Sequence, residues 1–564
     1  MNRLVTLAVI GLLMLFVALP VGLVLIGAVT HPNMTFTTFY LTETLTNPLY
    51  RLGLLTALQV AAITTTLAFL LALPLAYLGW RYRWRGQGLW EALLLTPLVL
   101  PPFVGALGVF QILGHYGVVS VLGVHLGLWE FANAPDLLGN HRLLTVCIIE
   151  ALGLFPVLYL ALAASLGRLD PALVESAAIA GAGPWVRFRR IILPLLRPGA
   201  FAGGSVVFIW SLTELGTPLM LGLDRIAPVQ VFNGLQDLQG NRLPLALALI
   251  LLVLAAAAFV LGRLTLGRDI PAGSSRGSAA SAARPLFGVH AWLVSLPFAV
   301  VAGLAALPHL AVVLIGAAGD WYQTLLPARL TTDHYHAALA HAAVVPGIIN
   351  SLTFASLATL LAVALGTVIA WLSVRGHTRL APIAETLAMI PLAVPGLIMA
   401  FGFLALALVA GLAVPALRPW LDPQANPTLL LVIAYAVRRL PHAVRAVHAG
   451  LAQSPPALEE AAAACGAGPV TRLRRITLPL IAGSLAAAAL LTFSFSMLEV
   501  SDSLVLAQQR AAWPIARVIF DLVGVLGAGP AIACAFATWA MLFLTATLAA
   551  AAVFLGKGPR ALFR

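Results

Sequence analysis

The sequence predicts an all-α integral membrane protein of about twelve transmembrane helices, arranged as two parallel repeats of six. Of the 564 residues, 61% are hydrophobic and 9% are charged, whereas soluble domains carry about 25% charged residues. Apolar runs of about 20 residues, long enough to cross a bilayer as a helix, recur along the whole chain. The second half of the chain also repeats the first, so the predicted spans fall into two equal sets.

The apolar runs give the expected spans. Those of the first half, residues 1–267, lie at about 4–30, 53–79, 88–113, 143–166, 199–222 and 243–266. Those of the second half, residues 288–564, lie at about 291–317, 346–373, 383–411, 428–451, 482–506 and 527–555. Between them, residues 268–287 are rich in Gly, Ser, Ala and Arg, a composition that predicts a flexible cytoplasmic linker. Six spans per half give both halves the same orientation across the membrane.

The repeat can be followed residue by residue. Residues 53–78 align with 347–372 at an offset of 294, and the same offset pairs Gly108 with Gly402. After the third span of each half the offset becomes 285, because one loop of the second half is shorter. The duplication therefore covers most of the chain.

A polar, arginine-bearing segment follows the fourth span of each half, at 168–197 and 453–482. In the first, Pro171 can begin a helix because its missing N–H would be unpaired there anyway. Gly181 can end that helix in the left-handed conformation, and Pro184 can begin a second one. Each segment is therefore expected to form helix, turn and helix.

The two segments share one motif. It resembles the EAA loop of permease subunits of bacterial ATP-binding-cassette importers: Glu-Ala-Ala, three residues, Gly, nine residues, Ile-x-Leu-Pro. The second segment matches at Glu460, Ala461, Ala462, Gly466, Ile476, Leu478 and Pro479. The first matches at Glu175, Ala177, Gly181, Ile191, Leu193 and Pro194, with Ser176 where the pattern has alanine. Arginines are expected to belong to the same surfaces: Arg187, Arg190, Arg472 and Arg475.

The resemblance implies a type I importer permease fold, in which each segment forms a coupling helix seated in a cleft of an ATPase subunit. The fused two-half arrangement resembles the ferric-iron and thiamine importer permeases. It implies import of iron(III), with thiamine, a polyamine or a phosphonate as alternatives. It also implies two partners, a homodimeric ATPase and an extracytoplasmic substrate-binding protein. The alternative for the segments is that they are positively charged loops that only hold the topology.

This chain is not expected to be an enzyme or to bind ATP, since the motif G-x-x-x-x-G-K is missing. ATP and magnesium are expected on the partner ATPase, and no cofactor, metal site or nucleic-acid partner is predicted here. An ion-coupled secondary transporter and a non-transporting scaffold are the rival classes. The two matched polar segments argue against the secondary transporter, and the paired acids within the spans, Glu214 and Glu499, argue against the scaffold.

Arginine and lysine predict the orientation. Both polar segments, the linker and both termini fall in the cytoplasm if most positive residues lie inside. The chain is accordingly expected to be a multi-pass protein of the bacterial inner membrane, with the lipid bilayer as a partner.

Ionisable residues also interrupt the spans, where they are costly and therefore candidates for function. Glu214 and Glu499 are related by the offset of 285, and Asp502 follows one helical turn later. These acids are expected either to line a translocation pathway or to fix helix packing. A second group, Arg438, Arg439 and Arg445, lies in the tenth span. These arginines are expected either to contact an anion or binding protein, or to have a structural role through pairing or a shallow position in the membrane.

Overall fold

The computed structural model of the chain describes residues 2–31, 33, 35–98, 102–234, 241–266, 283–376, 378–497 and 499–554. Most of the predicted linker, 268–287, lies outside these residues. Its last part contributes β2 (Arg284–Pro285), which pairs in parallel with β1 (Tyr82–Arg83). A second pair is antiparallel, β3 (Ala318–Asp320) with β4 (Arg329–Leu330). Apart from these short strands, the regular structure of the described residues is helical.

Among the described residues, nine helices are long and apolar enough to cross a membrane, or up to eleven if each of two bent helix pairs counts as one span. The predicted tenth span is α23 (Thr428–Gln453), which has 26 residues but is interrupted by Arg438, Arg439 and Arg445. The all-α membrane class is therefore confirmed, with each predicted span represented by helical structure.

The chain forms two compact units that interleave along the sequence. Unit 1 comprises Met1–Thr46, Val231–Leu252 and Tyr335–Leu562. Unit 2 comprises Asn47–Gln230, Val253–His334 and Phe563–Arg564. Each unit thus combines most of one sequence half with the first span of the other half. The predicted boundaries of the halves follow the duplication, not this division in space.

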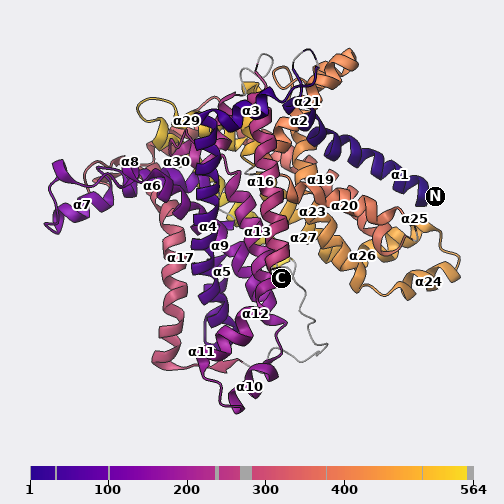
Figure 1. Cartoon of the computed structure of the whole chain (residues 1–564), viewed down its shortest axis with the longest axis horizontal. Helices are drawn as coiled ribbons and strands as arrows, with labels where there is room; N and C mark the ends of the chain where they lie inside the picture. The colour runs from indigo at the N-terminus through magenta and orange to yellow at the C-terminus, as the bar shows by residue number, and fades with distance from the viewer. Residues whose placement is uncertain are drawn as a thin grey trace. The chain divides into compact units, whose positions relative to one another are not determined.

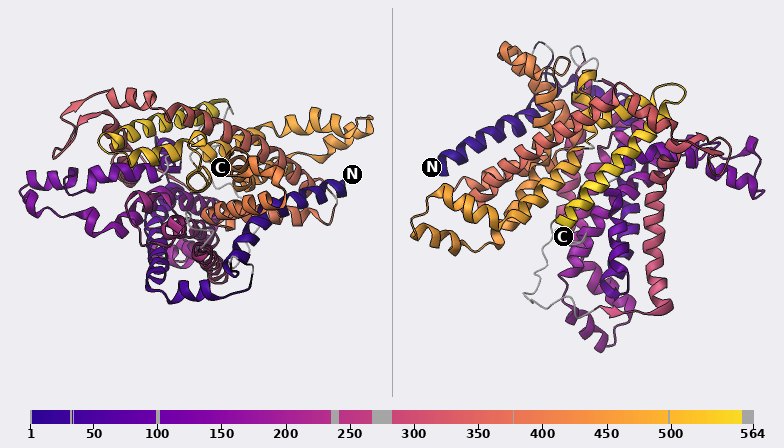
Figure 2. Two further views of the ribbon diagram at one scale, coloured as in Figure 1. Left: turned by 90° about the horizontal axis from the view of Figure 1, so that it is seen from above. Right: turned by 180° about the vertical axis from the view of Figure 1, so that it is seen from behind.

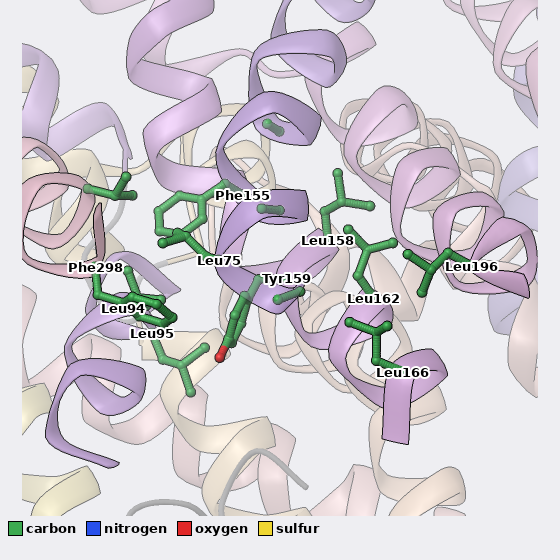
Figure 3. Packing of buried hydrophobic residues seen from close by; sticks show 14 of the residues in the cluster. Leu75, Leu94, Leu95, Phe155, Leu158, Tyr159, Leu162, Leu166, Leu196 and Phe298 are labelled. Atoms are coloured by element: carbon green, nitrogen blue, oxygen red, sulfur yellow. The ribbon is translucent and has the colours of Figure 1, made fainter. Parts of the chain in front are cut away.

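Unit 2 is built around α9, whose residues Phe155, Leu158 and Leu162 are fully buried. Their spacing of three and four places them on one face, in contact with α4, α13 and α17. In Figure 3, Leu75 of α4 and Phe298 of α17 lie on the side of Phe155, and Leu196, just before α13, lies on the side of Leu158 and Leu162. The helices of this unit, drawn in Figure 1, are α4 (Pro48–Arg81), α5 (Gln87–Leu94), α6 (Pro102–Leu113), α7 (Val118–His125), α8 (Leu137–Asn140), α9 (Arg142–Gly167), α10 (Pro171–Ile179), α11 (Pro184–Arg187), α12 (Leu193–Leu195), α13 (Arg197–Leu212), α14 (Gly216–Met220) and α17 (Gly288–Ala317).

Unit 1 has the same plan with α23 in the position of α9, packed against α19 and α27. Its helices are α1 (Asn2–Leu13), α2 (Leu19–Ala28), α3 (Phe39–Thr46), α19 (Val344–Val374), α20 (Ala381–Ala393), α21 (Gly396–Ala413), α22 (Arg418–Leu421), α23, α24 (Pro456–Ala464), α25 (Pro469–Arg472), α26 (Leu478–Leu480), α27 (Ala482–Met497), α28 (Ser501–Leu506), α29 (Ile515–Val523) and α30 (Gly529–Phe554). Three helices cross the boundaries of the units: α15 (Ala227–Asn233), α16 (Leu243–Leu266) and α18 (Asp333–Ala340).

The paired glycines predicted from the repeat have the same packing role in each unit. In unit 2 a Cβ on Gly108 of α6 would overlap the carbonyl oxygen of Pro308 in α17. In unit 1 a Cβ on Gly402 of α21 would lie 2.6 Å from the carbonyl oxygen of Pro20 in α2. Small residues allow backbones to approach closely in membrane bundles. Each glycine therefore holds the first span of the other sequence half against its own unit.

Four spans predicted as single helices are divided. The predicted span 199–222 consists of α13 and α14, and the predicted span 482–506 consists of α27 and α28. The other two contain prolines at or near the break. The predicted span 88–113 consists of α5 and α6, which are separate helices, and the predicted span 383–411 consists of α20 and α21. The break between α20 and α21 falls at Val394, immediately before Pro395. Proline removes a backbone donor and disfavours helix in the residue before it, so prolines inside an apolar run divide it.

Candidate functional site

The first predicted coupling segment forms a hairpin at one end of unit 2, labelled α10 and α11 in Figure 1. Asp170 caps α10 by accepting a hydrogen bond from the Ala172 N–H at 2.9 Å. Gly181 turns the chain with φ of +83°, a conformation that strains any residue with a Cβ. The second arm, Pro184–Leu195, is continuous through α11, the π-helical turn η4 (Phe188–Ile192) and α12, and meets the next helix at a bend of 63°.

The second predicted coupling segment has the same form in unit 1. α24 ends at Ala464, and Gly466 turns the chain after it, again with φ of +83°. The arm Pro469–Leu480 contains the π-helical turn η8 (Leu473–Thr477), at the repeat offset from η4, and bends by 73° into α27. Single π-helical turns are rare and often mark functional sites. We name these hairpins, 171–195 and 456–480, the first hairpin and the second hairpin.

The residues of the predicted motif lie mainly on the outer surfaces of the hairpins. The exposed ones are Glu175, Gly181, Arg190, Leu193, Glu460, Ala461, Gly466, Arg475 and Pro479. Those with intermediate exposure are Ala177, Arg187, Pro194, Arg472 and Leu478. Large apolar side chains are exposed beside them, with Ile179 at 89%, Trp185 at 68% and Val470 at 76%. Both hairpins thus present a mixed apolar and charged surface, the composition typical of a protein contact rather than of a packed core.

The hairpins are anchored by different chemistry. In the first, Val174 and Ile192 are buried in the core of unit 2, and Phe188 meets Tyr77 of α4 with ring centroids 5.4 Å apart. In the second, Glu459 occupies the place of Val174 and pairs with Arg375 at the end of α19, at 3.4 Å.

Arg375 also donates to two backbone carbonyl oxygens at the end of α23, those of Leu451 at 3.0 Å and Ser454 at 2.6 Å. The second hairpin is therefore tied to two spans of its unit through one guanidinium group.

The acids predicted in the eleventh span belong to a charged cluster that joins α23 to the break between α27 and α28. Arg438 contacts Glu499 at 2.7 Å and Asp502 at 3.5 Å. Arg439 pairs with the other oxygen of Glu499, donates to the Phe495 carbonyl oxygen at 3.1 Å and lies over the Phe495 ring. The four charges cancel, and both carboxylates are almost fully buried, at 4% and 1% exposure. We call these four residues, Arg438, Arg439, Glu499 and Asp502, the ionic cluster.

Arg445 is exposed, farther along α23, and takes no place in this cluster. Arg438 and Arg439 thus have the contacts expected of structural pairs, because they neutralise buried acids. Buried charges are stable only when paired in this way.

Unit 2 has acids at the corresponding break but a different environment. Glu214 lies between α13 and α14, as Glu499 lies between α27 and α28, and is half-buried. Near it, Glu150 of α9 is buried and accepts hydrogen bonds from Ser211 and from Thr64, the latter at 3.5 Å.

Glu150 was missed by the sequence reasoning. Its repeat partner is Tyr435, whose hydroxyl contacts Ser503 at 2.6 Å. An acid in the middle of the apolar span 143–166 is the signal that could have found it.

Both breaks are places where a span stops being helical inside the bundle. Irregular backbone at membrane depth is tolerated where protein or a water-filled cavity surrounds it, and transporters form substrate sites at such breaks. Glu214 and Glu499 are both located there, which keeps them as candidates for the pathway. The pairing of Glu499 with two arginines equally supports the packing alternative.

The chain is similar to known transport proteins along most of its length. Residues 65–266 and 343–553 each match the family described as binding-protein-dependent transport system inner membrane component. The ferric transport system permease protein FbpB of Actinobacillus pleuropneumoniae is 26% identical over 435 residues, 74% of this chain and 59% of the relative.

Two shorter relatives align with part of the chain. The molybdenum transport system permease protein ModB of Mycobacterium tuberculosis is 30% identical over 233 residues, 40% of this chain and 84% of the relative. The spermidine/putrescine transport system permease protein PotB of Haemophilus influenzae is 28% identical over 211 residues, 36% of this chain and 72% of the relative. With two matches to one family, two matched hairpins and two similarly built units, this chain belongs to the inner-membrane components of binding-protein-dependent transport systems, as a fused permease with both family domains on one polypeptide.

Proposed function

We propose that this permease is the membrane channel of an iron(III) importer and that its two hairpins couple it to a separate ATPase. The observation that carries the coupling role is the presence of two exposed hairpins with the same turn, the same π-helical turn and the same motif, one in each unit. Loops that only set the membrane topology need positive charge. They have no need to share the same turn and the same π-helical turn.

The hairpins suit the transmission of force. Each second arm is continuous in sequence with a membrane span and joins it at a bend, 63° in one unit and 73° in the other. A partner that moves the hairpin therefore acts directly on the helix that contains the break with Glu214 or Glu499. We propose that this partner is a homodimeric ATPase, which binds ATP and magnesium. Both hairpins and both termini of the permease are then in the cytoplasm.

Iron(III) as cargo rests on the relatives. The ferric permease aligns with 74% of this chain, across both family domains, whereas the molybdenum and polyamine permeases align with 40% and 36%. A substrate-binding protein outside the membrane is proposed to deliver the cargo, since the family depends on such proteins.

A double substitution tests the coupling. Gly181→Asp with Gly466→Asp places side chains at two left-handed positions and charges on both proposed docking surfaces, so ATP hydrolysis and uptake should become uncoupled. Radioactive iron uptake and ATPase activity are measured in proteoliposomes that contain the permease, its ATPase and its binding protein. Gly183→Asp with Gly468→Asp is the matched control, because these exposed glycines have φ near −65°.

The outcomes separate the parts of the proposal. Uptake that is unchanged in the Gly181/Gly466 variant contradicts the coupling role. Uptake driven by an ion gradient alone identifies a secondary transporter. Uptake of molybdate or thiamine but not iron, with coupling intact, contradicts only the cargo.

A further inference from the structure

An apolar cavity of about 250 Å³ lies in unit 1, at the end of its spans remote from the second hairpin. Five helices contribute to it: α18, α19, α27, α29 and α30. Its lining includes Leu339, Ile348, Met497, Ile515, Trp539 and Phe543. Along α19, Ile348 lies about 27 residues, roughly 40 Å of helix, from the hairpin anchor Arg375. Along α27, Met497 lies about 17 residues, roughly 25 Å, from the end of the second hairpin.

The cavity has a closed floor and an open rim. Its floor is formed by buried side chains, with Met497 and Ile515 at 2% exposure and Phe536 at 0%. At its rim, Trp539 and Phe543 of α30 remain 42% and 43% exposed. Both rim residues belong to a helix long and apolar enough to cross a membrane, which runs along the near side of its unit in yellow in the right-hand view of Figure 2. The opening therefore faces the apolar exterior of the spans.

The floor is held in place by hydrogen bonds and is not a loose gap. The Ile515 N–H donates to the Ser351 hydroxyl at 2.8 Å, and the Asn350 side chain donates to the carbonyl oxygens of Ala511 and Trp513 at 2.8 and 3.1 Å. These bonds fix the segment before α29 against α19. A preformed cavity of this kind binds a ligand without the free-energy cost of rearranging the protein.

The chemistry of the lining selects the occupant. Every lining side chain is apolar or aromatic, so the cavity offers nothing to a charged or polar cargo, whose unpaired polar groups would cost several kcal/mol. Its volume is also below the range of about 300 to 1,000 Å³ usual for small-molecule sites. It suits one slender apolar segment whose remainder stays outside.

The membrane around the spans contains such segments, the acyl chains of its lipids. Tyr335 of α18 meets Trp539 edge to face, with ring centroids 6.2 Å apart, directly beside the rim. Tyr and Trp gather where lipid headgroups meet the hydrocarbon of a bilayer. We infer that this cavity binds one acyl chain of a membrane phospholipid, whose headgroup lies beside α18. Lipid binding at this site requires neither the proposed cargo nor the proposed ATPase contact.

The inference is tested by native mass spectrometry of the full-length permease extracted in mild detergent, after delipidation and addition of one phosphatidylethanolamine of known mass. The wild-type chain should retain one lipid per molecule at a concentration where annular lipid is lost. Ala540→Phe fills the cavity, since Ala540 is a buried lining residue, and should reduce retention at least tenfold. Leu542→Phe adds similar bulk on the same helix at a 58% exposed position outside the lining, and should retain the lipid.

A second readout guards against a variant that folds poorly. The fluorescence of Trp539 is taken as the difference in emission between the wild-type chain and Trp539→Phe. Phospholipid brominated along its acyl chains should quench this fluorescence, and the quenching should persist after annular lipid is exchanged for detergent. Equal retention in wild type and Ala540→Phe overturns the inference. So does an absence of retained lipid in the wild type, or retention of detergent only.

Discussion

The ionic cluster allows the pathway and packing roles of Glu499 to be separated by one set of variants. Arg439→Met keeps an unbranched apolar side chain but removes the guanidinium and its charge, and so leaves Glu499 with Arg438 as its remaining cationic partner, at 2.7 Å. Asp502 depends on the same Arg438, at 3.5 Å. After the substitution one guanidinium must therefore serve two buried carboxylates.

The expected loss of stability follows from these contacts. Removing one partner of a buried ion pair costs about 3–5 kcal/mol because a buried charge is left uncompensated. Since Glu499 retains Arg438, we expect roughly 2–3 kcal/mol for Arg439→Met, including its cation–π contact with Phe495, worth about 0.5–2 kcal/mol. Adding Glu499→Gln removes the surplus negative charge and should recover about half of the loss, so the two changes are strongly non-additive.

Free energies of unfolding from SDS titration in mixed micelles give the four corners of this double-mutant cycle. Arg445→Met, on the same helix but exposed, is the control and should change stability by no more than about 0.5 kcal/mol. Energies of Arg439→Met and Glu499→Gln that add to within about 0.5 kcal/mol would refute the coupling. Uptake then decides the role of Glu499: a double variant that is stable but does not transport indicates a pathway residue, and one that transports normally indicates packing.

Two further predictions concern positions fixed by close contacts. Gly396→Ala should destabilise unit 1 by about 1–3 kcal/mol, because its Cβ would overlap the Arg438 guanidinium, which is held by two carboxylates. SDS titration measures the loss of stability. Gly468→Ala is the control and should change the stability little, because no atom lies near the added Cβ. Arg375→Gln should loosen the second hairpin by removing its bonds to Glu459 and to the carbonyls at the end of α23. Hydrogen exchange should then rise in α24 but not in α10, and equal rates in α24 before and after the change would contradict the anchoring role.

The sequence predicted the features that depend on local chemistry and on the repeat. Pro171, Gly181 and Pro184 determine the first hairpin through preferences that act within a few residues, and the structure has helix, turn and helix at those positions. Gly108 and Gly402 were recognised as a pair from their offset alone. Their common role, close contact with a carbonyl oxygen of another span, could not be inferred because no local pattern reports which helices meet.

The sequence could not predict contacts between residues far apart in the chain. The first span of each sequence half belongs to the compact unit formed mainly by the other half. No periodicity in the sequence indicates this arrangement. The ionic cluster joins residues about 60 positions apart, so arginines and acids could be noted in neighbouring spans but not paired. The same limit applies to the cavity beside α30, whose lining is drawn from five helices and consists of residue types found throughout any membrane span.

The duplication itself shows how the ionic cluster could arise. At the contact between α6 and α9 of unit 2, Gly153 faces Pro102, and a Cβ on the glycine would lie 2.8 Å from the proline ring. At the repeat-related contact in unit 1 the sizes are reversed: Arg438 replaces Gly153, and Gly396 replaces Pro102 and leaves room for the guanidinium. Neither exchange fits without the other, because an arginine against proline would clash and a glycine against glycine would leave a void. The charge in unit 1 is therefore accommodated by a specific backbone position, and the two halves, similar in fold, differ in charge at the breaks where their spans leave the helical path.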